Sequence, residues 1–228
     1  MSEQPSQAVQ DYLKTIHRLG GADGIVFPVD IATALQVKAP SVTGMLKRLA
    51  EAGWINYAPK SGARLTPTGL AEALRVIRRH RLVELFLTQV LKLDWSEVDA
   101  EAESLEHAIS PRLEQALADY LGEPDEDPHG HPIPSRTGEL RLRNLRRLSE
   151  YRDGDTVVVR EAQDDNPARL RHWQELGLVP GATVRILHYQ PLDDLFEVEV
   201  AGRLIRLGSE GLAGLRGELT GPPGSAGG

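Results

Sequence analysis

Residues 39–68 read APSVTGMLKRLAEAGWINYAPKSGARLTPT, and this stretch decides the fold class. In its first half, Val42, Leu46 and Leu49 recur at the spacing of one face of an α-helix. Gly53 is a suitable C-terminal cap for that helix. Two short β-prone runs, WINY and ARLT, follow on either side of the turn PKSG. The stretch therefore predicts a helix followed by a β-hairpin.

Two further helical patterns precede this stretch. Residues 6–19 (SQAVQDYLKTIHRL) place apolar side chains at helical spacing and end at a Gly-Gly pair, and a second helix begins near Val29. Three helices followed by a hairpin is the order of a winged helix-turn-helix. We place this domain at residues 1–73.

The middle of the chain predicts a helical bundle. Residues 69–92, 96–109 and 110–121 form amphipathic helices that are rich in Leu, Val and Ile, as in a dimerisation bundle. Residues 122–136 (GEPDEDPHGHPIPSR) are irregular because Pro and Gly are frequent there. We place this second domain at residues 74–140.

From about residue 152 the hydrophobic period changes from about 3.6 to 2. The runs TVVVRE, ATVRILHY, LFEVEVA and RLIRLG read as strands, with a short helix at ARLRHWQELG. Short antiparallel strands of this kind predict a small SH3-like β-barrel over 152–220, after a linker at 141–151. The tail 221–228 is expected to be disordered. The fold class is thus a mainly α N-terminal part, with winged helix-turn-helix and bundle, followed by a C-terminal SH3-like barrel.

Composition limits the cellular setting and the chemistry. The chain has 228 residues, 40 % of them hydrophobic, and no cysteine. Disulfides and thiolate metal sites are therefore excluded, and a reducing cytoplasm is the expected compartment. The sequence MSEQPSQAVQDYL lacks the blocks of a signal peptide, and no apolar run approaches the length of a membrane span. We expect a cytoplasmic protein without a membrane partner.

The net charge of −7 is unevenly distributed. Residues 1–80 carry ten Lys and Arg against six Asp and Glu, whereas residues 81–150 carry eight against fifteen. A basic head on an acidic body fits one surface that meets phosphate and another that meets cations. An ordinary fluctuation of surface charge would give the same numbers, so both interpretations stay open.

The helix that starts residues 39–68 is the candidate DNA-reading element. Its apolar face would dock on the helix before it and leave small polar and basic side chains outside. Small polar groups near a helix N-terminus can approach base edges, whereas Lys and Arg suit phosphates. The candidate DNA contacts are Lys38, Pro40, Ser41, Thr43, Gly44, Lys47, Arg48, Lys60 and Arg64. The alternative is a winged helix that contacts protein.

An acidic cluster lies on the predicted helix 96–109. At 100° per residue, Asp99, Glu103, Glu106 and His107 fall within an arc of about 100°. Three acids beside a histidine repel one another unless a cation neutralises them. The alternative is a solvated acidic face.

Two weaker patterns accompany this cluster. His80 and Glu84 share one face of the preceding helix at i,i+4 spacing, although neighbouring arginines also favour a surface ion-pair network. The run Asp127-Pro-His129-Gly-His131 combines two side-chain types that bind metals with a proline that fixes the backbone. A flexible acidic linker is its alternative.

Together these patterns resemble one family. The ordered set DYLKTI, SVT, LxxxGWI, LTPxG, RxHRLxE, ExxEH and PHGxPIP is similar to the diphtheria toxin repressor family, which includes the manganese transport regulators. The resemblance covers nearly the whole chain. Its third domain resembles that of ferrous iron transport A proteins.

The resemblance implies two neighbouring metal sites. The primary site would use Asp11, Glu103, Glu106 and His107. The ancillary site would use His80, Glu84, Asp99 and a third-domain ligand, for which Asp164 and Asp165 are candidates. In some manganese-type members the PHG segment contributes, which would add Asp127 and His129.

Two positions bear on the choice of metal. Iron-type members have methionine and cysteine where this chain has Asp11 and Glu103, and hard oxygen ligands favour Mn²⁺. The small manganese regulators carry a further glutamate where this chain has Lys14, which argues against a two-ion site of their kind.

The resemblance implies a homodimeric repressor of metal-homeostasis genes that binds double-stranded operator DNA when Mn²⁺ is bound. It implies no enzymatic reaction and no small organic ligand. An Fe²⁺-dependent repressor is the alternative within the family. A hydrolytic metal centre or a metal-buffering protein is the alternative from another class.

Overall fold

The computed structural model describes residues 5–163 and 166–220. The chain divides into two compact units, and each has its own hydrophobic core. The first unit comprises Met1–His80, Glu103–Ala116 and Ile133–Leu140, and the second comprises Arg81–Ala102, Leu117–Pro132 and Arg141–Gly228. Residues 74–140 contribute to both units, and the predicted domain bounds stay a prediction.

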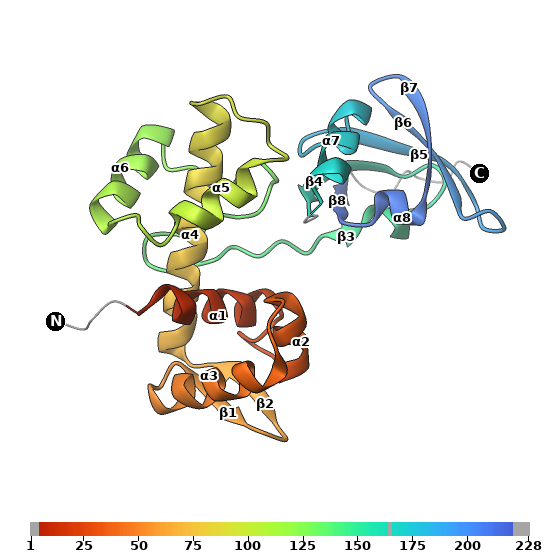
Figure 1. Ribbon diagram of the computed structural model, residues 1–228. Coiled ribbons are helices and arrows are strands. Elements are labelled where there is room, and N and C mark those ends of the chain that lie inside the picture. Colours follow the sequence, from red (N-terminus) through yellow and green to blue (C-terminus); the bar gives the residue numbers. More distant parts are fainter. Residues whose placement is uncertain (1–4, 164–165, 221–228) are drawn as a thin grey trace. The chain divides into compact units, whose positions relative to one another are not determined.

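The first unit contains the predicted three helices and hairpin. They are α1 (Gln7–Arg18), α2 (Pro28–Ala34), α3 (Ala39–Glu51), β1 (Ile55–Ala58) and β2 (Gly62–Leu65). The strands β1 and β2 are antiparallel, with Ile55 opposite Leu65. Figure 1 shows these elements in red and orange around the first turns of α4. Their common core joins Leu13 and Ile16 of α1 to Val42 and Leu46 of α3.

The next three helices are α4 (Pro67–Gln89), α5 (Val98–Leu105) and α6 (Pro111–Leu121). The helix predicted over 96–109 is shorter, because the chain turns after Leu105, where the amide of Ala108 bonds to its carbonyl. Pro111 opens α6 and disfavours helical backbone at the residue before it, so α5 cannot run into α6. Glu106 and His107 therefore lie in the turn after α5 and not on its face, which corrects the predicted arc.

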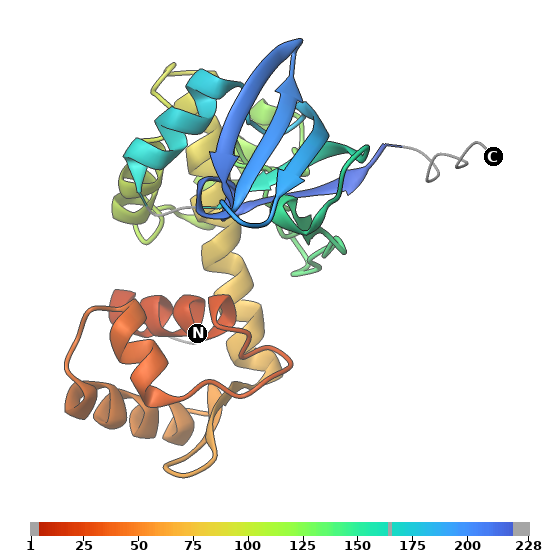
Figure 2. The ribbon, with the colours of Figure 1, turned by 90° about the vertical axis from the view of Figure 1, so that its right-hand side faces the viewer.

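The second unit contains an antiparallel six-stranded sheet. Its strands are β3 (Arg146–Arg147), β4 (Thr156–Ala162), β5 (Thr183–Gln190), β6 (Leu195–Val200), β7 (Arg203–Gly208) and β8 (Leu215–Leu219). Their order in the sheet is β3-β8-β4-β5-β6-β7, and Figure 2 shows β5, β6 and β7, in blue, side by side. The remaining elements of this part are the 3-10 helix Leu148–Glu150 and the helices α7 (Pro167–Leu176) and α8 (Ser209–Leu212).

The sheet is open within the described residues, whereas the sequence predicts a closed barrel. Its edges are β3 and β7, and β3 pairs only with β8. β3 has two residues, so it offers few hydrogen bonds for closure. The alternation of buried and half-buried side chains along β6 still follows the predicted period of 2.

Two expectations fall on residues outside the described part: the disordered tail 221–228 and the ligand candidates Asp164 and Asp165. Among the described residues, no helix has the length and apolar character needed to cross a membrane.

Candidate metal centre and nucleic-acid interface

Three buried ligand-type atoms face one another in the first unit. The Nε2 atom of His107 lies 2.8 Å from Oδ1 of Asp11 and 3.4 Å from Oε1 of Glu106. None of these three atoms makes a hydrogen bond. Atoms that bind one ion at about 2.0–2.6 Å lie within about 5 Å of one another, and these three lie within 4.8 Å. The donor set and its spacing therefore fit a metal ion.

The hydrogen bonds behind His107 fix which of its nitrogens faces the carboxylates. The carboxylate of Glu72 accepts a hydrogen bond of 2.8 Å from the amide nitrogen of Gln10. The amide oxygen of Gln10 is then left for His107, whose Nδ1 lies 2.8 Å away and donates to it. In the neutral ring, Nε2 then carries its lone pair on the side of Asp11 and Glu106. This is the tautomer that a metal ligand needs, held from behind as metal-binding histidines usually are.

Electrostatics at Asp11 also favours a cation. Burial raises the pKa of the Asp11 carboxyl above its ordinary value, and the charges of Glu103 and Glu106 act in the same direction. His107 acts against them. A buried carboxylate that faces another carboxylate and a histidine lone pair is unfavourable until a positive charge compensates it.

A lysine lies within the same cluster. The Nζ atom of Lys14 donates to Oε2 of Glu103 at 2.6 Å and to Oε2 of Glu106 at 2.7 Å. It also lies 3.1 Å from Nδ1 of His80. His80, Glu103 and Glu106 have the composition and spacing of a metal site, but the described contacts place the ammonium group of Lys14 among them.

The predicted ancillary ligands are divided between the two units. His80 belongs to the first unit, and Glu84 and Asp99 belong to the second. Within the second unit, carboxylate oxygens of Glu84 and Asp99 lie within 4.8 Å of each other. The assembly of all three into one site stays a prediction.

Asp127 and His129 lie in a turn of the second unit that is tightly bonded. One oxygen of Asp127 accepts the backbone amides of His129 and His131, and the other contacts the ring of His131 and the guanidinium of Arg81. Although burial opposes it, His131 and Arg81 hold the pKa of the Asp127 carboxyl below its ordinary value. These contacts give Asp127 a structural role, and its predicted role as a ligand stays a prediction.

His129 is also held on both sides of its ring. Nε2 donates to the carbonyl of Trp95 at 2.9 Å, and Nδ1 lies 3.4 Å from a carboxylate oxygen of Glu84. Burial disfavours the charged ring, but the hydrogen bond and charge of Glu84 outweigh it and raise the pKa of His129.

The predicted DNA-reading helix has the expected faces. Val42, Leu46 and Leu49 are buried in the core of the first unit. Thr43 is half-buried and its hydroxyl donates to the carbonyl of Ala39. The exposed candidates are Lys38, Pro40, Ser41, Gly44, Lys47 and Arg48 on this element and Lys60 and Arg64 on the hairpin. A basic outer face of this kind fits a phosphate backbone.

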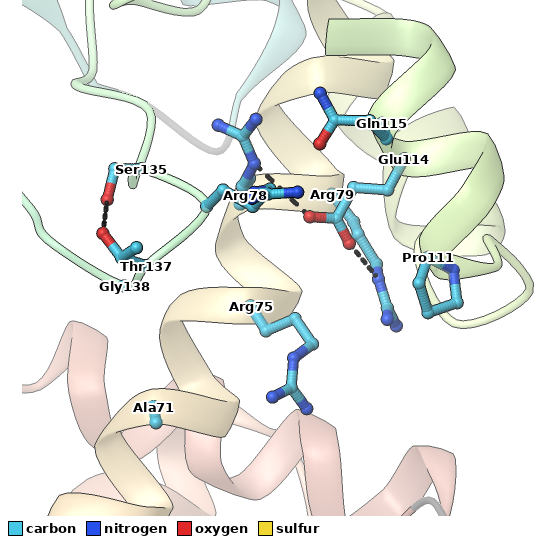
Figure 3. Close-up of a pocket in the computed structure, with 11 residues that line it drawn as sticks. Ala71, Arg75, Arg78, Arg79, Pro111, Glu114, Gln115, Ser135, Thr137 and Gly138 are labelled. Atoms are coloured by element: carbon cyan, nitrogen blue, oxygen red, sulfur yellow. Dashed lines mark hydrogen bonds and ion pairs between the residues drawn. The ribbon is translucent and has the colours of Figure 1, made fainter.

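The first unit also contains a basic pocket of about 290 Å³ between α4, α6 and the segment 135–138. Figure 3 shows Glu114 between Arg78 and Arg79 at this pocket. Nε of Arg79 donates to Glu114 at 2.9 Å, and Nε of Arg78 lies 3.3 Å from the other carboxylate oxygen. These buried ion pairs tie α4 to α6.

Sequence patterns missed three residues of the candidate metal centre. Gln10 and Glu72 orient His107, and Lys14 was noted only as a departure from the family pattern. Nothing in the local sequence identifies them, because their partners lie 62 to 97 residues away along the chain. The burial of two polar residues on α1, Gln10 and Lys14, is the signal in the structure.

Comparisons with known proteins agree with this geometry. Residues 6–63 match the family model described as iron dependent repressor, N-terminal DNA binding domain. Residues 66–135 match the metal binding and dimerisation domain of the same repressors, and residues 146–213 match the FeoA domain. The iron-dependent repressor IdeR of Mycobacterium leprae is 33 % identical over 190 residues, which are 77 % of this chain and 81 % of that protein. The chain belongs to the diphtheria toxin repressor family. It is a metal-dependent, DNA-binding transcriptional repressor.

The relatives of this repressor include proteins named for iron and proteins named for manganese. The diphtheria toxin repressor of Corynebacterium diphtheriae is 34 % identical over 123 residues, 54 % of each chain. A solved manganese-dependent transcriptional repressor in complex with manganese is 34 % identical, with a TM-score of 0.87 over 93 % of this chain and all of that one. Both iron-dependent and manganese-dependent proteins are thus among its relatives.

Proposed function

We propose that Mn²⁺ activates this repressor and that Asp11, Glu106 and His107 hold the ion. The observation that carries the proposal is the convergence of three buried acceptor atoms without hydrogen-bond partners. Bound there, a divalent cation would supply the positive charge that these atoms lack. Glu103, predicted as a fourth ligand, is half-exposed and contacts Lys14, so we place it at the edge of the centre.

The donor chemistry supports Mn²⁺ over softer ions. The set contains two carboxylates and one imidazole, and the whole chain has no cysteine. Carboxylate-rich sites suit Mn²⁺, whereas sulfur ligands favour softer metals. Fe²⁺ is the second candidate, supported by relatives named for iron.

The positions of the ligands explain how binding would act on DNA affinity. Asp11 lies on α1, which shares a core with the DNA-reading helix α3. Glu106 and His107 come from the turn after α5. Asp11 on one side and Glu106 with His107 on the other would hold the DNA-binding head against this turn. In a homodimer, fixed heads would space two recognition helices for successive major grooves of the operator.

The remaining expectations belong to the same proposal. We propose cytoplasmic homodimers that repress metal-homeostasis genes and catalyse no reaction, with the domain bounds given above and an SH3-like C-terminal domain. Bases and phosphates would be contacted by the exposed residues of α3 and the hairpin. An ancillary site would draw on His80, Glu84 and Asp99, with Asp127 and His129 as further candidates.

Operator binding should require the metal. In gel-shift titrations, affinity should rise with Mn²⁺, rise less with Zn²⁺ and fall in excess chelator. His107→Ala should abolish the Mn²⁺ response and keep the weak affinity for random DNA. Equal operator affinity in chelator and in Mn²⁺ would refute the proposal.

A further inference from the structure

Lys14 has the surroundings of a bound cation. Its side chain is about 8 % exposed, and its ammonium nitrogen has two carboxylates and one imidazole nitrogen within 3.1 Å. His80, Glu103 and Glu106 are themselves grouped at metal-site distances. The ammonium group of Lys14 lies among these three side chains, at a place where a metal ion could otherwise bind.

Glu106 links this lysine to the proposed metal ligands. Its Oε2 is bonded to Lys14 and to Nδ1 of His80, at 2.7 and 2.6 Å. Its Oε1 makes no hydrogen bond and faces His107. The fully buried carboxylate thus presents one oxygen to the ammonium group and leaves the other for an ion. Carboxylates that bridge two cations in this way are typical of two-metal sites.

The charges of the centre are consistent with a single ion. Asp11, Glu103 and Glu106 contribute three negative charges when ionised, and Lys14 contributes one positive charge. The net charge of minus two is neutralised by one divalent cation. A carboxylate in place of the lysine would make the net charge minus four, which needs two divalent cations.

We infer that Lys14 is a built-in second cation, so that this centre takes one divalent ion where a two-ion site would otherwise form. Lys14 donates to Glu103 and Glu106 and positions Glu106 for the ion at Asp11 and His107. The inference rests on the proposed metal function and adds the stoichiometry of the centre and the residue that sets it.

Electron paramagnetic resonance of Mn²⁺ bound to the full-length protein tests this directly. Two Mn²⁺ ions that share a carboxylate, about 3.5–4 Å apart, give an exchange-coupled spectrum, whereas a single ion gives an isolated six-line signal. An ion in a separate ancillary site lacks the shared carboxylate and does not produce coupling. The wild-type protein should show only isolated Mn²⁺ at every loading up to saturation.

Lys14→Glu should create the second position. We expect a coupled Mn²⁺ pair and one additional ion per protomer by calorimetry. Lys14→Gln removes the charge without adding a ligand, and it should bind Mn²⁺ without coupling. Comparison of the two variants therefore separates the effect of the added carboxylate from the effect of losing the ammonium group.

The wild-type spectrum and the Lys14→Glu variant can each overturn the inference. A coupled pair in the wild-type protein would show that Lys14 does not replace an ion, even if Lys14→Glu failed to fold. A folded Lys14→Glu protein with only isolated Mn²⁺ would overturn it as well. A wild-type protein that binds no Mn²⁺ would instead refute the proposed function, and this outcome is distinct from the other two.

Discussion

The chemistry of His107 depends on side chains that never touch the proposed ion. Glu72 orients the amide of Gln10, and Gln10 accepts the proton of His107 Nδ1. Arg75 forms an ion pair with Glu72 one helical turn away. The imidazole is therefore set in one tautomer by an uninterrupted chain of hydrogen bonds.

Breaking this chain should weaken metal binding without removing a ligand. Gln10→Met keeps the length of the side chain but loses the acceptor for Nδ1, so the ring can reorient or change tautomer. We expect Mn²⁺ affinity, measured by calorimetry, to fall about 10–100-fold, as for other residues that orient metal ligands. Gln7→Met, an exposed position on the same helix, is the control and should bind normally. Equal affinities in both variants would show that Gln10 does not orient His107.

At the scale of secondary-structure elements, Glu114 is the main polar link between α4 and α6 described above. Its side chain is 11 % exposed, and those of Arg78 and Arg79 are 5 % and 3 % exposed. Glu114→Ala would leave two buried guanidinium groups without this carboxylate. Removal of one partner from a buried ion pair costs about 3–5 kcal/mol, so thermal unfolding should shift strongly to lower temperature. The control variant Glu51→Ala removes an exposed carboxylate at the end of α3 and should leave the unfolding temperature nearly unchanged. An equally small effect of Glu114→Ala would show that the ion pairs of Glu114 do not hold α4 and α6 together.

The turn of the PHG segment depends on Gly130. Its φ is +84°, and a Cβ atom there would lie 1.8 Å from the carbonyl oxygen of Arg160 on β4. The neighbouring His129 carbonyl accepts the amide of Ala162, so the turn lies directly against this strand. No side chain fits without a shift of backbone.

Gly130→Ala should therefore destabilise more than backbone conformation alone explains. Gly122 has a similar φ of +79°, but a Cβ atom there meets nothing within 4 Å. Gly122→Ala should cost about 1–2 kcal/mol for the left-handed backbone, and Gly130→Ala should cost clearly more in denaturant unfolding. Equal losses would show that the turn can move away from β4.

The predictability of the elements follows from their hydrophobic periods. The helices α1, α3 and α4 and the strands β4–β7 carry enough regular apolar positions to be identified to within a few residues. β3, with two residues, and β8, which contains Gly217, do not carry such a period. The end of α5 was misplaced because the helical pattern continues past Leu105, whereas the chain turns before Pro111.

For the whole molecule, the sequence indicated the DNA-binding and metal-binding roles through ordered motifs rather than through geometry. The contacts of Lys14 could not be read from the sequence, because α1, α4 and the turn after α5 must first come together. Proximity between residues 14, 80 and 106 is a property of the folded chain alone.

DNA reading and metal sensing should be separable in the intact protein. Lys47→Ala and Arg48→Ala remove exposed basic groups from α3. They should weaken binding to operator and random DNA alike and reduce the slope of log affinity against log salt by about one unit each. Mn²⁺ affinity without DNA should stay unchanged in calorimetry. A loss of sequence preference with an unchanged salt slope would instead assign these side chains to base edges.

The lysine beside Glu103 and Glu106 also bears on how a promoter would respond to the cell's manganese supply. A centre that must capture two ions fills with the square of the free metal concentration, so its genes switch over a narrow range. A centre whose second charge is a lysine needs one ion and fills in simple proportion at low occupancy. Each protomer of such a repressor would therefore respond to the metal less steeply than a protomer with a two-ion centre.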